Sequence, residues 1–185
     1  LVAMMTGNEC RGRELQAYAR LHSGRWGIAL ALVCGKSLAY GVLYGVFAFF
    51  LTGFLPLIFD IPHAASGLSL VALMVPYILS TSFLGLALSR WYTDPEAPIL
   101  LIAFFSIGLI FLSGVSYPLE LIPWYWQIAH CLIPAAPAVL AFVKLSSMEA
   151  SLHDITPELA MLCVQTTVYF LLAVMVYSRK LFRFY

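Results

Sequence analysis

The chain has 185 residues, of which 62% are hydrophobic and only 10% are charged. Soluble domains carry about 25% charged residues, so this composition excludes an ordinary water-soluble fold and indicates a protein embedded in a membrane. The formal net charge of +1 averages segments of opposite sign, and the distribution of the charges is more informative than their sum.

The first predicted element is an amphipathic helix in segment 8–25. Asn8 is a suitable N-cap, and Glu9 is favourable in a first helical turn. Leu15 and Tyr18 belong to one apolar stripe, and most charged side chains lie elsewhere. Two interpretations remain open: the helix lies on anionic lipid headgroups, or it docks on a cytoplasmic protein. Its length and mixed charge favour docking.

Four later stretches are each apolar for about 20 residues, which is the length that a helix needs to cross the hydrocarbon layer. The apolar run before the first stretch begins near Gly27, but Lys36 interrupts it, and a lysine at mid-bilayer costs about 3 kcal/mol. We therefore place Lys36 at the membrane interface as an anchor, and we expect segment 27–35 to be a membrane-surface lead-in or a first turn. The four predicted transmembrane helices are Ser37–Phe59, Gly67–Ser89, Ala97–Tyr117 and Glu158–Ser178.

Local signals mark the starts and the interior of these spans. The run Thr93-Asp94-Pro95-Glu96 precedes the third span and Thr156-Pro157-Glu158 precedes the fourth. Each run combines an N-cap residue, a first-turn proline and an acid, which is typical of a helix start. Pro76 lies inside the second span and predicts a kink there.

The segment between the last two spans, 118–145, is mostly apolar but is broken by Pro134 and Pro137. Its two pieces are each too short to cross a membrane. We expect short helices that dip into the outer leaflet, with Trp124, Tyr125 and Trp126 at the level of the headgroups. An amphipathic surface loop is the alternative.

The basic residues divide unequally between the two sides of the four spans. Lys144 is the one basic residue on the side of segment 118–145, and the other nine of the ten fall on the opposite side. By the positive-inside rule, that opposite side is cytoplasmic. Both termini are then expected in the cytoplasm, as an even number of spans requires. The nine residues are Arg11, Arg13, Arg20, Arg25, Lys36, Arg90, Arg179, Lys180 and Arg183.

The sequence contains no pattern of a catalytic or metal site. It has neither a G-x-x-x-x-G-K-[ST] phosphate loop nor a G-x-S-x-G nucleophile elbow. Glu149 and His153 are spaced for one helix face, but no third ligand lies near them. No acid or base lies deep within a span, which argues against an intramembrane protease or a proton-coupled carrier. Energy for any transport must then come from another protein.

The order of these features resembles the second half of the ABC type-2 transport permeases, over nearly the whole chain. A charged helix leads to Gly35-Lys36-x-x-x-Tyr40 and a long span, and a short outer loop contains Phe59-Asp60-Ile61-Pro62. The next span ends in Leu88-Ser89-Arg90. The string Ser113-Gly114…Tyr117-Pro118-Leu119-Glu120…Pro123-Trp124 directly after a span is the most specific part.

This resemblance implies an all-α integral membrane fold with four transmembrane helices, a cytoplasmic coupling helix and short outer-leaflet helices between the last two spans. It implies a bacterial inner-membrane permease subunit of an ATP-driven exporter, surrounded by membrane lipids. A second permease subunit would complete the pathway, and a separate ATPase subunit would bind ATP and Mg, so no cofactor is expected in this chain and no nucleic acid as a partner. The family's first span and large external domain have no counterpart here, so we expect the chain to be the C-terminal half of such a subunit.

The resemblance also assigns roles to residues. Those expected to couple to the ATPase are Glu9, Arg11, Arg13, Glu14 and Arg20. Those expected at the outer gate or exit are Gly114, Pro118, Glu120, Pro123 and Trp124.

A membrane structural or assembly protein without transport activity is the alternative from another class. Ser37, Gly41 and Gly45 recur at helical spacing in the first span, and such small residues let membrane helices pack closely. This alternative predicts no nucleotide-binding partner.

Overall fold

The computed structural model describes residues 25–59, 66–89, 123–148 and 150–181, together with position 2 and single positions between 99 and 114. All regular secondary structure in these residues is helical, in agreement with the predicted class. The predicted segment 8–25, except for its last residue, and most of span 97–117 lie outside the described residues. Three described helices are long and apolar enough to cross a membrane: Trp26–Ile58, Gly67–Leu88 and Thr156–Arg179.

The first of these helices contains a change of helix type near its end. Helix α3 (Arg25–Phe49) continues into the π-helix η1 (Phe50–Phe54) and the short α4 (Leu55–Ile58). Pro56 explains the change, because proline has no N–H to donate and its ring clashes with the carbonyl four residues earlier. Just before Pro56, the Leu55 N–H donates to the Phe50 carbonyl, five residues earlier. This wider π turn avoids the clash between the proline ring and the carbonyl four residues before it.

Helix α3 begins before the predicted first span, and segment 27–35 is regular α-helix rather than a lead-in. The 33 residues from Trp26 to Ile58 span about 50 Å, against a hydrocarbon thickness of about 30 Å. Part of the helix must therefore extend beyond the hydrocarbon. The Lys36 Nζ lies 5.8 Å from the centre of the Tyr177 ring on the last helix, so a contact with another helix accommodates its charge.

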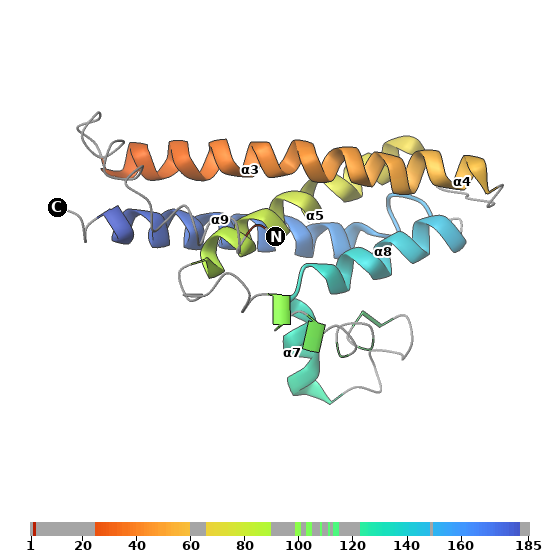
Figure 1. The fold of residues 1–185 in the computed structure, drawn as a ribbon. Coiled ribbons are helices and arrows are strands. Elements are labelled where there is room, and N and C mark those ends of the chain that lie inside the picture. Colours follow the sequence, from red (N-terminus) through yellow and green to blue (C-terminus); the bar gives the residue numbers. More distant parts are fainter. Residues whose placement is uncertain are drawn as a thin grey trace.

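Three long helices form the body of the fold (Figure 1). Helix α5 (Gly67–Leu88) starts at Ser66, whose hydroxyl oxygen caps it by accepting from the Ser69 N–H. Helix α9 (Thr156–Leu181) runs alongside α3 in the opposite direction, and α5 packs against both. Pro76 lies inside α5, which continues through it.

A hydrogen bond joins α9 to α5 at Pro76. The Thr166 hydroxyl lies 3.1 Å from the Pro76 carbonyl oxygen and 2.7 Å from the Leu162 carbonyl oxygen of its own helix. This bond is made to the carbonyl of Pro76 itself and not to the carbonyl four residues earlier, which is the one that a proline leaves without a helical donor. In an apolar surrounding, such a bond holds two helices at a fixed height relative to each other.

Helix α9 contributes to two separate apolar clusters. One joins it to α3 and α5 through buried residues such as Val33, Leu86 and Tyr177. The other lies toward its N-terminal half and includes Leu73 of α5 and Leu162. By contrast, a side chain added at Gly41 or Gly45 would meet no atom of the described residues within 4 Å. Within the described part of the chain, Gly41 and Gly45 are therefore not used for close packing, whereas Ser37 on the same face is buried.

We predict that Thr166→Val weakens the contact between α9 and α5. The substitution keeps the shape of the side chain and removes the bond to Pro76, which should lower the free energy of unfolding by about 0.6–1.7 kcal/mol. Thermal unfolding in detergent measures the effect. Thr167→Val is the matched control, because the exposed Thr167 hydroxyl bonds only to the Cys163 carbonyl of its own helix. Equal losses in both variants would contradict the prediction.

Candidate functional site

Two short helices in the segment before α9 form a sharply bent pair. Helices α7 (Trp124–Leu132) and α8 (Ala135–Ser147) meet at 86°. Helix α8 packs against α5 and α9, whereas α7 turns away from the bundle (Figure 1). The 13 residues of α8 extend only about 20 Å, which is too short to cross the hydrocarbon. A bent pair of this kind is either one broken span or a re-entrant loop, and we call it the α7–α8 hairpin.

The bend of this hairpin, which we call the elbow, consists of the end of α7, Ile133 and Pro134. Tyr169, which contacts the elbow, is 13 residues beyond Thr156, or about 20 Å along α9. The residues of the elbow differ in exposure, since Pro134 is fully buried whereas Leu132 is 59% exposed. Main-chain groups that leave a helix in an apolar environment require partners from the protein.

Side chains of α9 satisfy the carbonyl groups at the elbow. The Gln165 Nε2 donates to the Cys131 carbonyl oxygen at 2.7 Å, and the Tyr169 hydroxyl donates to the Leu132 carbonyl oxygen. Gln165 and Tyr169 are both buried and lie one turn apart on α9. Two consecutive carbonyls at the C-terminus of α7, which no longer have helical donors, are thus bonded by one face of a neighbouring helix.

Prolines reduce the number of N–H groups at the elbow that require partners. A helix start leaves its first N–H groups without intrahelical acceptors. Pro134 and Pro137, both fully buried at the start of α8, have no N–H at all. The Ala136 N–H donates to the Ile133 carbonyl at 3.1 Å, and the Ala138 N–H to the Pro134 carbonyl at 3.4 Å. The prolines that predict the interruption between α7 and α8 therefore also reduce the number of N–H groups left without a partner in an apolar environment.

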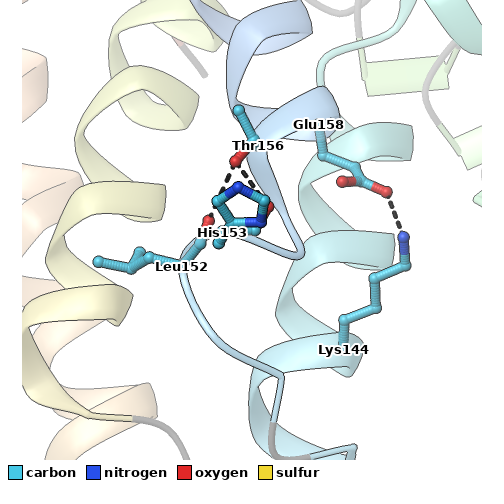
Figure 2. Close-up of polar contacts among 5 residues, drawn as sticks. All are labelled: Lys144, Leu152, His153, Thr156 and Glu158. Carbon is cyan, nitrogen blue, oxygen red and sulfur yellow. Dashed lines mark hydrogen bonds and ion pairs between the residues drawn. The ribbon is translucent and has the colours of Figure 1, made fainter.

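The far end of α8 is joined to α9 by an ion pair. The Lys144 Nζ lies 2.5 Å from the Glu158 Oε1, and the two side chains point toward each other (Figure 2). Lys144 is in the last turn of α8 and Glu158 in the first turn of α9. Each charge is therefore favourable for the dipole of its own helix. The Lys144 side chain is 32% exposed and the Glu158 side chain 10%. We call this pair the clasp.

The connection between α8 and α9 contains a hydrogen-bonded turn. The Asp154 carboxylate accepts from the Ser151 hydroxyl and the Ser151 N–H, each at 2.8 Å. These bonds favour the ionised carboxylate and hold the pKa of Asp154 below its ordinary value of 3.8. Their contribution to stability is consequently present at neutral pH and is lost as the pH falls below that value.

The predicted N-cap of α9 is displaced by one residue. The Leu159 N–H donates to the Ile155 carbonyl, which makes Ile155 the N-cap. The Thr156 hydroxyl instead donates backward to the His153 carbonyl at 2.6 Å (Figure 2). Thr156 was therefore wrongly assigned as the cap, because its side chain bonds the preceding turn rather than a helical N–H.

The predicted gate residues are only partly within the described part of the chain. Gly114 has a φ of 78°, a conformation that favours glycine, and its N–H donates to the Phe111 carbonyl. Pro123 immediately precedes α7, and Trp124 is 72% exposed at its start. Pro118 and Glu120 lie outside the described residues, as do the predicted coupling residues Glu9, Arg11, Arg13, Glu14 and Arg20.

The residues that hold the hairpin were not predicted from the sequence. Gln165 and Tyr169 read as ordinary members of the fourth span, and Glu158 as a first-turn acid. A polar Gln in the middle of an apolar span was the available signal, because polar groups in a membrane require partners. Within the described residues, no group of three His, Cys, Asp or Glu side chains could hold a metal ion. The contacts described above position the helices relative to one another.

Comparison with known proteins identifies one family. The sequence model of the family described as "ABC-2 family transporter protein" matches residues 4–175 of the chain. No curated protein matches the chain, and neither does any solved structure.

We predict that Tyr169→Phe destabilises the protein, because it removes the hydrogen bond from the buried Tyr169 side chain to the Leu132 carbonyl. Such a bond contributes about 0.5–1.5 kcal/mol, and thermal unfolding in detergent should reveal the loss. Tyr125→Phe is the control, since Tyr125 is 54% exposed at the start of α7. A Tyr169→Phe variant as stable as the Tyr125→Phe variant would contradict the assigned role of the hydroxyl.

Proposed function

The chain belongs to the ABC-2 family of transporter proteins, and from this premise we propose that it is the membrane permease subunit of an exporter driven by a separate ATPase. The family match over residues 4–175 carries this proposal. Membership establishes a membrane component of an ABC transporter that is not itself catalytic. Export, the coupling to ATP hydrolysis and the roles of individual residues are the proposed steps.

The arrangement of the helices is consistent with separate roles for segment 8–25, in ATPase coupling, and for the α7–α8 hairpin, at the exit. Segment 8–25 directly precedes α3, whose first turns pack against the C-terminal half of α9 through Ala29 and Val33. The α7–α8 hairpin packs on the N-terminal half of α9. Helix α3, which follows segment 8–25 in the chain, and the α7–α8 hairpin therefore both contact α9.

The charge distribution supports the orientation of this arrangement. Nine of the ten basic residues belong to the side of segment 8–25 and the chain ends, which by the positive-inside rule is the cytoplasmic side. The ATPase subunit then meets segment 8–25 through Glu9, Arg11, Arg13, Glu14 and Arg20. The α7–α8 hairpin belongs to the outer end, where it lines or closes the exit. A second permease subunit completes the pathway in a bacterial inner membrane.

We predict that reversing two charges in segment 8–25 uncouples the permease from its ATPase. Arg13→Glu combined with Glu14→Lys should weaken ATPase binding at least about tenfold and abolish stimulation of ATP hydrolysis by the permease. Pull-down and ATPase assays on the complex in lipid measure both effects. Arg183→Glu, in the basic tail outside segment 8–25, is the control. Unchanged binding and stimulation would refute the coupling assignment, and purification without any ATPase would favour a structural protein.

We predict that the connection between α8 and α9 is accessible from outside the cell. A cysteine replacing Met148, which is 69% exposed, should react with a membrane-impermeant thiol reagent on intact cells. The native Cys10 should react only after the membrane is opened. Labelling with and without permeabilisation separates the two positions, and the reverse pattern would overturn the proposed orientation.

A further inference from the structure

The hydroxyl group of Ser80 on α5 is buried and has no hydrogen-bond partner among the described residues. A serine inside a helix can donate to the carbonyl three or four residues earlier, and a buried hydroxyl without a partner costs free energy. For Ser80 these two carbonyls are those of Tyr77 and Pro76. The other contacts of the two carbonyls explain why Ser80 bonds neither of them.

Both carbonyls already accept a hydrogen bond from a threonine. The Pro76 carbonyl accepts from the Thr166 hydroxyl of α9 at 3.1 Å. The Tyr77 carbonyl accepts from the Thr81 hydroxyl of α5 at 3.0 Å. A carbonyl oxygen has two lone pairs, and an α-helix uses one of them for its own N–H bond. Thr166 therefore occupies the lone pair of the Pro76 carbonyl that Ser80 could otherwise use.

Thr166 can withdraw from Pro76 and still remain bonded. Its hydroxyl has a single hydrogen to donate, and the distance to the Leu162 carbonyl of its own helix, 2.7 Å, is shorter than the 3.1 Å to the Pro76 carbonyl. If α9 parts from α5 here, the bond to Leu162 stays and the Pro76 carbonyl becomes available to Ser80. An ordinary hydrogen bond between membrane helices would instead leave a donor and an acceptor unpaired on release, because lipid replaces neither.

We propose that Ser80 is the reserve donor for the Pro76 carbonyl: it takes over that carbonyl when Thr166 withdraws, so that α9 can part from α5 at this point without loss of a hydrogen bond. Gln165, the neighbour of Thr166, bonds the end of α7. A movement of α9 at this point would therefore also move a contact that holds the α7–α8 hairpin. The exchange requires neither nucleotide nor partner protein, so the purified chain is sufficient to test it.

A double-mutant cycle tests the exchange in the full chain, by thermal unfolding in detergent. Ser80→Ala alone should change the melting temperature by less than about 2 °C, because the hydroxyl that it removes forms no bond. In the parent, Ser80 recovers part of the loss caused by Thr166→Val. In the Ser80→Ala background that recovery is absent, so Thr166→Val should lower the melting temperature by at least about 2 °C more. Equal losses in the two backgrounds would refute the exchange.

Ser82→Ala is the matched control for this cycle. Ser82 is also fully buried on α5, and its hydroxyl likewise has no partner among the described residues. The carbonyl four residues before it belongs to Ile78, however, and accepts from Thr81 of the same helix. The losses from Thr166→Val and Ser82→Ala should therefore be additive. A coupling as large as that with Ser80→Ala would show a general loosening of α5 and would overturn the role given to Ser80.

The Pro76 carbonyl can also be observed directly by NMR. Pro76 and Tyr77 form the only proline–tyrosine pair in the chain, so isotope labels on the proline carbonyl carbon and the tyrosine nitrogen select this one carbonyl. Loss of a hydrogen bond moves a carbonyl carbon signal upfield. The signal in Thr166→Val should stay close to that of the parent and should move upfield only when Ser80→Ala is added. An upfield shift that is already complete in Thr166→Val would show that Ser80 does not take over the carbonyl.

Discussion

The hairpin depends on two hydrogen bonds, from Gln165 and Tyr169 of α9 to the carbonyl oxygens at the end of α7. A chain that turns back inside an apolar bundle exposes main-chain donors and acceptors that only the protein can satisfy. The acceptors are bonded by these two side chains. The donors are largely removed, because Pro134 and Pro137 have none. These contacts hold the end of α7 against α9, and α8 continues from there to the Lys144–Glu158 ion pair.

Helix α9 connects the parts of the fold that carry the proposed roles. It bonds the hairpin through Glu158, Gln165 and Tyr169, which follow one face of the helix at intervals of seven and four residues. Its C-terminal half packs against α3, where Tyr177 meets Lys36. Thr166, next to Gln165, bonds α9 to the Pro76 carbonyl of α5. A displacement of α9 would therefore move its contacts with α3, with α5 and with the hairpin together.

Local pattern was sufficient to predict the long helices but not the contacts between them. The second span was placed at Gly67–Ser89, and α5 is Gly67–Leu88, because the Ser66 cap and the apolar length are both local. Helix α3 begins before the predicted first span, at Arg25, since the cost expected for Lys36 takes no account of the Tyr177 ring more than a hundred residues away. The elbow was missed for the same reason: Gln165 and Tyr169 bond main-chain groups 34 and 37 residues distant, and carbonyls leave no signature in a sequence.

The π-helix near the end of the first span introduces a phase shift along that helix. The single π turn accommodates one additional residue. The residues after it are therefore rotated by about 100° around the helix axis relative to an uninterrupted α-helix. In an uninterrupted α-helix, Leu57 would lie about 100° around the axis from Leu38. The π turn takes back that rotation, so the exposed Leu57 returns to the side of the exposed Leu38 and Val42. The first span therefore presents its exposed apolar residues before and after the π turn in one direction, toward the same neighbours.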